Sequence, residues 1–243
     1  MTWQELGDGI FRRRYESLDL NAGLILGETS ALVIDSRATH GQADELIADI
    51  RALTSLPVTH LVNTHHHWDH TFGNARFLPS EIVGHVRCAS ALADRGEDMR
   101  RMLLDAEWVP QEAKPHFEEV EITPPDTTFE RTLTVELEGR SVELSHLGRG
   151  HTDNDIIVEV DGVLFAGDLV EEGGPPQFGD AFPREWLETL DAIVSRSADT
   201  VVPGHGDIVG RDFVEAQRER MARAIGGESV FPDPIMEQLR TRL

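Results

Sequence analysis

Apolar residues in the first third of the chain follow two different spacings. Three short apolar runs, at 10–15, 20–26 and 31–34, are separated by turns containing Gly, Asn or Glu-Thr-Ser, and they predict a β-meander. Over 41–54 the apolar positions recur with a helical period, which predicts an amphipathic helix packed on that sheet. The next apolar run, 58–63, predicts a buried strand.

The remainder of the chain continues this alternation of strands and helices. The expected elements are a short helix ending at 74–77, a strand at 81–84, a helix at 85–109, hairpins at 132–137 with 141–146 and 155–160 with 163–165, a helix at 185–194, a strand at 200–202 and a helix at 212–225. The 85–109 helix has an apolar face, interpreted as core packing or an oligomer contact rather than a substrate lid, that contains Met99, Met102, Leu103 and Leu104. Strands in both halves followed by helices predict an α/β (α+β) fold with two facing sheets and helices outside.

Composition narrows the classes of partner. The chain has 243 residues without a linker-like stretch, so a single domain spanning 1–243 is expected. A formal net charge of -22 repels nucleic acid and anionic membranes, and leaves a small molecule as the expected substrate. The densest basic cluster, Arg12-Arg13-Arg14, is interpreted as a solvated strand edge.

Cysteine content and the N-terminal residues bear on the compartment. The single Cys88 excludes an internal disulfide, and no apolar run approaches the ~18 residues of a membrane span. The first residues lack a basic start followed by an apolar segment. A cytoplasmic location is therefore expected.

The densest chemistry in the sequence follows the strand at 58–63. Residues 64–70 read Thr-His-His-His-Trp-Asp-His, which places five metal-capable side chains in seven residues. In an extended loop His65 and His67 project to one side, while Asp69 and His70 follow around the turn. Two pairs of ligands can therefore face two adjacent sites, and imidazole with carboxylate is the ligand set of catalytic Zn²⁺ or Fe²⁺.

Three more metal candidates follow strands in the second half. His151 and His205 lie in glycine-flanked loops, and Asp168 ends the apolar run Leu-Phe-Ala-Gly-Asp. Together with the cluster they make seven candidate ligands: His65, His67, Asp69, His70, His151, Asp168 and His205. Seven ligands suit two metals if one carboxylate bridges them and a water completes the shells.

The order of these motifs resembles the metallo-β-lactamase superfamily over essentially the whole chain. The resemblance rests on His65-x-His67-x-Asp69-His70, Gly-His151-Thr, Gly-Asp168 and Gly-His205-Gly. It implies a four-layer αββα sandwich with the metals at one edge, between the two sheets. It also implies that His65, His67 and His151 hold the first zinc, that Asp69, His70 and His205 hold the second, and that Asp168 bridges them.

The residue at position 168 bears on the choice within the superfamily. True β-lactamases of the superfamily carry Cys or Ser at the place of Asp168 and act outside the cytoplasm, whereas the Asp pattern resembles glyoxalase II thioesterases and lactonases. Glyoxalase II usually adds a glutathione-binding helical extension, for which only 226–243 remain here. The resemblance therefore favours hydrolysis of a small carboxyl ester, lactone or thioester, with a β-lactam as a promiscuous substrate.

The ligand set also predicts a mechanism. Two divalent ions, with Zn²⁺ expected first and Fe or Mn as alternatives, share a water and lower its pKa from ~15.7 toward ~7. Hydroxide then attacks a carbonyl, so no protein nucleophile is required. Asp69 is the expected catalytic residue because its carboxylate can orient the hydroxide and relay its proton.

Three other functions share parts of this pattern. A mononuclear iron persulfide dioxygenase uses the same scaffold with a site of two His and one carboxylate. A ribonuclease Z-like nuclease resembles the motif, but this acidic chain has no basic arm for RNA. A non-enzymatic metal-binding module would keep a closed four-ligand shell, whereas seven ligands with an open bridge favour chemistry.

Residues beside the motifs have alternatives of their own. His66 points away from its neighbours and is expected at the surface or behind a ligand, and Asp155 either bonds a ligating imidazole or closes a turn. Trp68 and Phe72 either line the pocket mouth or pack in the core. The irregular stretch 173–182 follows Asp168 directly and is a candidate to shape the substrate pocket.

Overall fold

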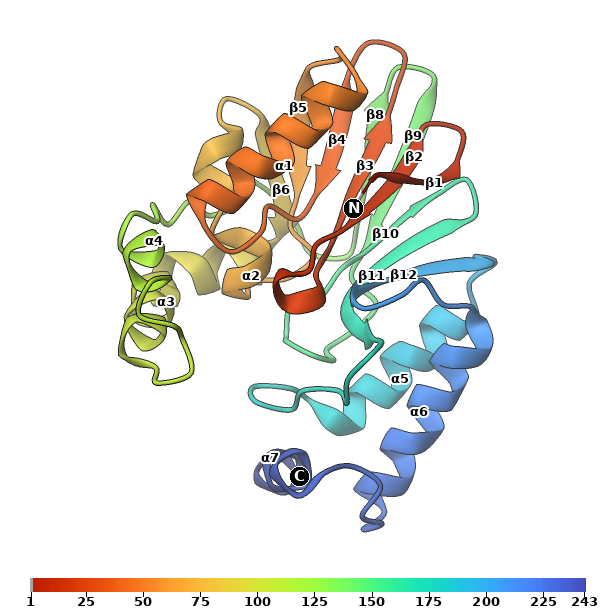
Figure 1. The fold of residues 1–243 in the computed structure, drawn as a ribbon. Helices are drawn as coiled ribbons and strands as arrows, with labels where there is room; N and C mark the ends of the chain where they lie inside the picture. The colour runs from red at the N-terminus through yellow and green to blue at the C-terminus, as the bar shows by residue number, and fades with distance from the viewer. Residues whose placement is uncertain (1) are drawn as a thin grey trace.

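Two β-sheets packed face to face form the centre of the computed structural model, which describes residues 2–243 (Figure 1). Helices cover the outer face of each sheet, so the layers follow the order αββα. The four-layer sandwich expected from the sequence is thereby confirmed.

The first sheet is built from the N-terminal half of the chain. Its seven strands lie in the order β1-β2-β3-β4-β5-β6-β7, antiparallel from β1 to β4 and parallel from β4 to β7. The strands are β1 (Gln4–Gly7), β2 (Ile10–Arg14), β3 (Asn21–Leu26), β4 (Ala31–Ile34), β5 (Val58–Val62), β6 (Glu81–His85) and β7 (Thr127–Phe129). Because β4, β5 and β6 are parallel, the loops after them meet at one edge of the sheet.

The second sheet has five strands in the order β12-β11-β10-β9-β8. They are β8 (Thr132–Leu137), β9 (Arg140–Ser145), β10 (Ile157–Val160), β11 (Val163–Glu171) and β12 (Thr200–His205). Only β11 and β12 are parallel neighbours. A bridge between Leu20 and His205 connects this sheet to the start of β3, so the two sheets approach each other at the same edge.

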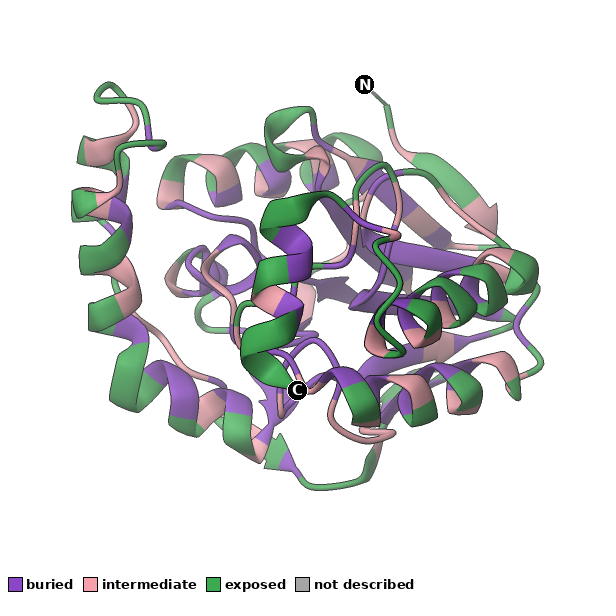
Figure 2. Ribbon diagram, turned by 90° about the horizontal axis from the view of Figure 1, so that it is seen from below, coloured by how far each residue is buried: buried purple, intermediate pink, exposed green. Residues whose placement is uncertain are grey.

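Helices close the sandwich on both sides. On the first sheet lie α1 (His40–Leu53), the short α2 (Trp68–Thr71) and the 3-10 turn η2 (Asn74–Phe77), while a second 3-10 turn, η1 (Ser17–Asp19), precedes β3. A lobe beside them consists of α3 (Val86–Asp105) and α4 (Lys114–Glu118). The second sheet is covered by α5 (Pro183–Val194) and α6 (Arg211–Ile225), and the chain ends in α7 (Asp233–Arg242). Figure 2 shows that the strands are largely buried, whereas each helix exposes one side.

The apolar core explains why these elements stack. Ile25 and Leu32 of the first sheet face Leu144 and Phe165 of the second, and all four are buried. On the outer face of the first sheet, Leu46 of α1 packs among apolar residues of β3 and β4. Each such side chain stabilises the fold by roughly 1.5–3 kcal/mol through burial. The core therefore rests on apolar contact, independent of the polar edge described below.

Several element boundaries differ from those expected from the sequence. The helix expected at 85–109 ends at Asp105. Strand β11 continues through Asp168 to Glu171, because the last residues of β11 pair with β12. The strands β1 and β7 and the helices α4 and α7 were not expected. They are short or carry little periodic apolar signal, and tertiary contacts stabilise them. Within residues 2–243 no helix combines the length and the apolar character needed to cross a membrane.

The interpretation of the arginine cluster as a solvated edge is wrong. Arg12 and Arg13 are 6% and 8% exposed, because Arg12 lies against the loop that follows β12 and Arg13 pairs with Asp49 of α1. The Arg12 guanidinium donates to Asn21 Oδ1 at 2.8 Å and to the Gly206 carbonyl at 2.9 Å. The cluster therefore fixes the loop that follows β12.

Candidate metal centre

All seven candidate ligands lie at one edge of the sandwich, between the two sheets. The His65–His70 segment follows β5 and ends in α2, and His151 lies in the connection from β9 to β10. Asp168 belongs to β11, and His205 is the last residue of β12. The fold thus brings together residues that are up to 140 positions apart (205 less 65).

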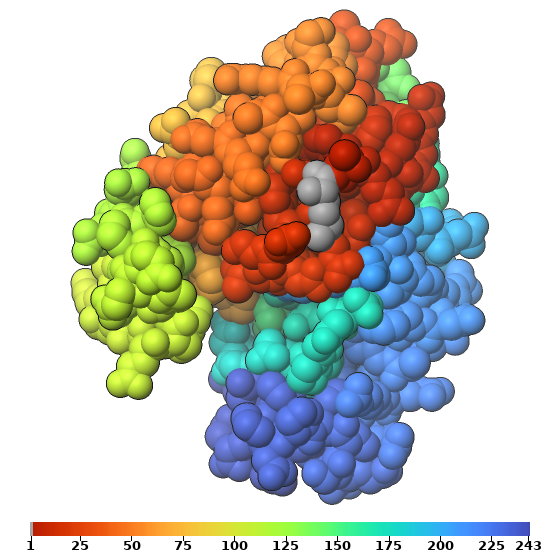
Figure 3. All heavy atoms as spheres, viewed as in Figure 1, coloured from red at the N-terminus to blue at the C-terminus, as the bar shows by residue number. Residues whose placement is uncertain are grey.

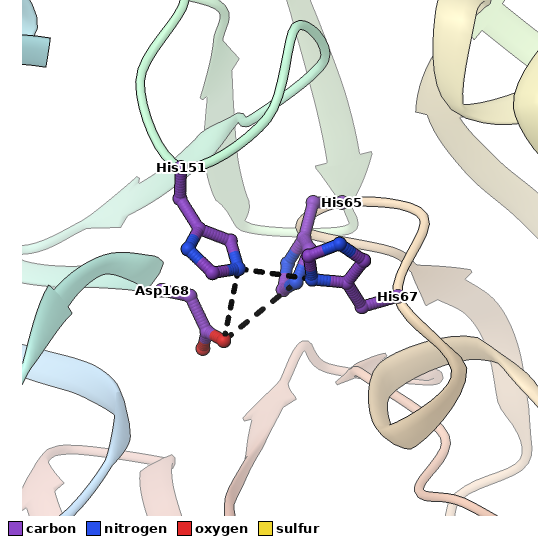
Figure 4. A group of neighbouring side chains, drawn as sticks. All are labelled: His65, His67, His151 and Asp168. Carbon is purple, nitrogen blue, oxygen red and sulfur yellow. Dashed lines mark hydrogen bonds and ion pairs between the residues drawn. The ribbon is translucent and has the colours of Figure 1, made fainter. Parts of the chain in front are cut away.

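Four of these side chains form the first group, His65, His67, His151 and Asp168 (Figure 4). One ligand atom from each lies within 4.8 Å of all the others. His151 Nε2 is 2.9 Å from His67 Nδ1 and 3.4 Å from Asp168 Oδ2, and Asp168 Oδ2 is 3.7 Å from His65 Nε2. The four side chains therefore point into one small space, as Figure 4 shows.

The second group consists of Asp69, His70 and His205. His205 Nε2 is 3.3 Å from Asp69 Oδ2 and 3.4 Å from His70 Nε2. Asp168 touches this group too, since its Oδ1 is 3.3 Å from His70 Nε2 and its Oδ2 is 3.4 Å from His205 Nε2. The Asp168 carboxylate thus lies between the two groups.

The polar atoms of the centre fit a bound cation. His65 Nε2 and Asp168 Oδ1 are buried and have no hydrogen-bond partner among the described residues. Burying such atoms without a partner costs free energy, which a metal ion at this position would offset. Burial, and next the adjacent His70, hold the pKa of His65 well below its usual range, and burial lowers that of His151 to about 4. Both rings are therefore in the neutral form that binds metal.

The two carboxyl groups are held in their ionised form. Burial raises the pKa of Asp168, but the neighbouring His205, His70 and His65 outweigh burial, so its pKa lies well below the usual range. For Asp69, likewise, His70 and His205 outweigh burial and the pKa is lowered. Although burial lowers them, the neighbouring carboxylates raise the pKa values of His67, His70 and His205, so a bound metal would displace protons from these three rings. Imidazole with carboxylate is the donor set of Zn²⁺ and non-haem iron sites.

A second layer of contacts orients the imidazole rings. Asp35, just after β4, contacts His70 Nδ1 at 2.8 Å through Oδ2 and accepts from Thr64 N and Thr64 Oγ1. Asp180 lies 3.2 Å from His67 Nε2, and the Leu18 carbonyl lies 2.7 Å from His205 Nδ1. Acceptors at the outer nitrogen keep the inner nitrogen of each ring free for a metal.

Close backbone approach also shapes the centre. A Cβ added at Gly204 would overlap Asp168 Oδ1, so only glycine at this point of β12 leaves room for the carboxylate. Glycine before His205 is thus required by Asp168 on the neighbouring strand.

The structure settles several alternatives around the motifs. His66 is buried rather than at the surface, and its Nδ1 lies 3.0 Å from Asn154 Nδ2. Asp155 closes a turn, since it accepts from Thr152 N and Thr152 Oγ1 and bonds no candidate ligand with its carboxylate. Trp68 lines the pocket, whereas Phe72 is buried in the core beside α3.

A pocket of about 590 Å³ opens onto the centre. Its lining includes the ligands His67, Asp69, His151, Asp168 and His205. The 173–182 stretch contributes Gln177, Gly179 and Asp180, in agreement with its expected role, and Gln238 comes from α7. Glu171 also lines this space, and burial, followed by the Asp168 carboxylate, raises its pKa to about 8.

Sequence reasoning missed three carboxyl groups of this edge, Asp35, Asp180 and Glu171. Asp35 had a recognisable signal, because it leaves a buried strand just as Asp168 was expected to do. Asp180 lies in a stretch without periodicity, so its contact with His67 could not be read from spacing. Met102, expected in core packing or an oligomer contact, is 48% exposed and lines the pocket, so it does not pack in the core.

Comparison with known proteins identifies the family. A family model described as the metallo-beta-lactamase superfamily matches residues 18–205, a range that contains all seven candidate ligands. The chain belongs to the metallo-β-lactamase superfamily. It has the fold of this superfamily, and its clustered His and Asp side chains could hold metal ions.

Sequence identity between the chain and individual relatives is limited. It is 33% identical over 102 residues to metallo-beta-lactamase type 2 of Bacteroides fragilis, covering 39% of this chain and 41% of that protein. It is 24% identical over 258 residues to a linear primary-alkylsulfatase of Pseudomonas sp. (strain ATCC 19151), covering 86% and 48%. The chain thus spans less than half the length of these two relatives.

Solved structures support the fold assignment. The metallo-beta-lactamase from Pontibacter korlensis matches with a TM-score of 0.72 and 19% identity, covering 90% of this chain and 98% of that one. At this identity the likeness establishes the shared fold.

Proposed function

We propose that this chain hydrolyses a small carboxyl ester, lactone or thioester at a centre of two divalent metal ions. The position of Asp168 carries the proposal. Its carboxylate contacts His65 and His151 of the first group and His70 and His205 of the second, at 3.3 to 3.7 Å. A carboxylate between two ligand groups is the arrangement that a bridging ligand needs.

The proposed ligands divide between the two groups. His65, His67 and His151 would hold one ion, Asp69, His70 and His205 the other, and Asp168 both. Bound divalent ions supply a water with a lowered pKa and polarise a carbonyl oxygen. Zinc is the proposed ion, and iron or manganese suits the same donors.

The protein itself contributes orientation and proton transfer. Asp69 lines the pocket in its ionised form, so its Oδ atoms can accept the proton of an attacking water. Asp35 and Asp180 hold the rings of His70 and His67 in place. The leaving alkoxide or thiolate departs after water adds to the carbonyl, giving an acid and an alcohol or thiol.

A second candidate function is hydrolysis of a β-lactam. It is favoured by the structural likeness to the Pontibacter korlensis metallo-beta-lactamase and by the Bacteroides fragilis relative. Aspartate at 168, where true β-lactamases have Cys or Ser, favours the ester, lactone or thioester reaction instead.

Metal quantitation and a substrate panel test the proposal. The purified protein is expected to bind close to two divalent ions per chain and to cleave esters, lactones or thioesters faster than β-lactams or RNA. A single iron with oxygen uptake would replace the proposal by a persulfide dioxygenase. Efficient cleavage of a tRNA precursor without ester turnover would replace it by a nuclease.

A further inference from the structure

A side pocket of about 290 Å³ adjoins the metal centre. It shares His67, Trp68, Met102 and Asp180 with the pocket over the centre, so the two pockets lie side by side. Its other lining residues are His66, Arg95 and Met99. In Figure 3 the lobe of α3 and α4 stands apart from the C-terminal part of the chain, with a hollow between them.

One wall of the side pocket is apolar. Trp68, Met99 and Met102 line it, and Trp68 packs against Trp108 and Phe117 with ring centroids 6.2 Å and 5.6 Å apart. Met102 and Trp108 are 48% and 62% exposed although both are large and apolar. Exposed apolar side chains gathered beside a centre are typical of a ligand-binding surface.

Arg95 lines the side pocket together with the polar residues His66, His67 and Asp180. The exposed guanidinium of Arg95 makes no hydrogen bond and no ion pair with any residue between positions 2 and 243. Its neighbours on α3 behave differently, since Arg100 pairs with Glu97 and Arg101 pairs with Asp98. Asp98 lies three positions after Arg95, a spacing that allows a pair, yet it pairs with Arg101.

The charge of the molecule makes this free guanidinium notable. The chain has 44 acidic against 22 basic residues. Asp180 is the other charged group lining the side pocket. Its carboxylate already contacts His67 Nε2 at 3.2 Å and His66 Nε2 at 3.6 Å. Arg95 is therefore the cation of this space that remains available to an anion, and guanidinium binds a planar or tetrahedral oxyanion through paired N–H donors.

We propose that the side pocket binds an apolar substrate group that ends in an anion, with Trp68, Met99 and Met102 along the apolar part and Arg95 at the anion. The proposal rests on the proposed function in that the bound group belongs to the hydrolysed substrate. It selects acidic amphiphiles, for example acyl chains with a terminal carboxylate, over neutral esters of the same length.

Direct binding tests the subsite apart from turnover. Octanesulfonate and octanol are titrated by calorimetry into the zinc-loaded protein and into its Arg95→Gln and Arg95→Lys variants. Arg95→Gln is expected to weaken the binding of octanesulfonate about tenfold and to leave the binding of octanol unchanged. Arg95→Lys should bind octanesulfonate more tightly than Arg95→Gln but more weakly than the unsubstituted protein. Arg131→Gln is the matched control, because it changes the net charge by the same amount. Arg131 is exposed and has no ion pair in residues 2–243.

Kinetics test the link to the substrate. The p-nitrophenyl esters of hexanoic acid and of adipic acid differ by one terminal carboxylate. For Arg95→Gln, kcat/KM is expected to fall about tenfold for the adipate ester alone, mainly through KM. Met102→Gln should lower kcat/KM for both esters, because it removes apolar contact without changing the charge.

The outcomes separate the two proposals. If octanesulfonate binding does not respond to Arg95, or responds equally to Arg131→Gln, the subsite is wrong whatever the turnover. If octanesulfonate binding depends on Arg95 but no ester, lactone or thioester is cleaved, the subsite stands and the proposed hydrolysis fails. Equal losses for hexanoate and adipate esters would also contradict the anion role.

Discussion

At the scale of single residues, the metal centre depends on two kinds of carboxylate. Asp168 faces both ligand groups directly, whereas Asp35 and Asp180 act on the outer nitrogens of His70 and His67. Direct and indirect contacts should differ in their effect on metal affinity, and two substitutions measure that difference.

Asp168→Ala should weaken metal binding most. It removes the negative charge between two ligand groups, so the repulsion between two dications is less well offset. We expect at least a 10–100-fold loss of affinity for one ion, with the fold retained. Metal content, ester turnover and thermal unfolding are measured beside Asp161→Asn, an exposed residue of the β10–β11 turn. Two retained ions with unchanged turnover would exclude a bridging role.

Asp180→Ala should act through His67. Without the contact at 3.2 Å the ring loses its orienting acceptor, and we expect roughly tenfold weaker zinc binding with a smaller change in turnover of the fully loaded protein. Asp180→Asn should recover part of the affinity, because its amide oxygen still accepts from His67 Nε2. The readout is the zinc dissociation constant in a chelator competition, and equal affinity for all three proteins would contradict the role.

At the scale of elements, neighbouring strands constrain each other at the centre. β12 passes so close to β11 that a Cβ on Gly204 would overlap Asp168 Oδ1. The loop of 173–182 is braced in turn by α7, whose Gln238 accepts from Phe178 N at 3.0 Å and whose Arg242 donates to the Ala181 carbonyl at 2.9 Å. The last helix thus supports the loop that carries Asp180.

Gly204→Ala tests the fit between β11 and β12. The new methyl group should displace the Asp168 carboxylate, so metal content and turnover are expected to fall at least tenfold. Gly174→Ala is the control, since a Cβ there meets no atom within 4 Å. Metal analysis and X-ray absorption at the zinc edge report the change, and an unaltered zinc spectrum would show that the strand adapts.

At the scale of the whole molecule, buried histidines outside the centre couple stability to pH. His85 is buried, its ring lies 4.2 Å from that of His146, and its Nδ1 accepts from Arg87 N. Burial, and then the neighbouring His146, lower the pKa of His85 to about 4. The folded protein therefore holds this ring neutral at pH values where the unfolded chain would protonate it.

The sign of the pH dependence follows from that lowered pKa. Between about pH 6.5 and pH 4 the unfolded chain binds the proton and the folded chain does not, so this contribution to stability is present above pH 6.5 and is lost on acidification. From pH 7 to pH 5 we expect a loss of roughly 1–2 kcal/mol. In urea unfolding with a chelator present, the free energy of unfolding should fall less from pH 7 to pH 5 in His85→Gln than in the wild type. The control is His116→Gln, a substitution at an exposed position of α4, which should behave as the wild type does. Equal slopes would contradict the assignment.

Much of the architecture could be predicted from local patterns. The meander, α1, β5 and both later hairpins follow from alternation, helical period and turn residues, which act within a few positions of the chain. By contrast, β7 and α7 are defined by their tertiary neighbours. Ile235, Met236 and Leu239 of α7, for example, are buried against the cluster around α5 and α6. The burial of Arg12 and Arg13 was not predicted, because it depends on distant segments, the loop after β12 and the helix α1, that pack against them.

The amino-acid sequence by itself determined which residue types could bind metal and where they follow strands. The spacing of His65, His67, Asp69 and His70 is a property of one short segment, so it predicts two adjacent groups of ligands without a structure. Only the tertiary structure decided that Asp168 lies between them, that Asp180 reaches His67, and that Arg95 has no partner. Asp168 is 98 positions from His70 and 37 from His205, and Asp180 is 113 positions from His67. Such contacts, and the lack of one at Arg95, depend on how the two sheets and the α3 lobe pack.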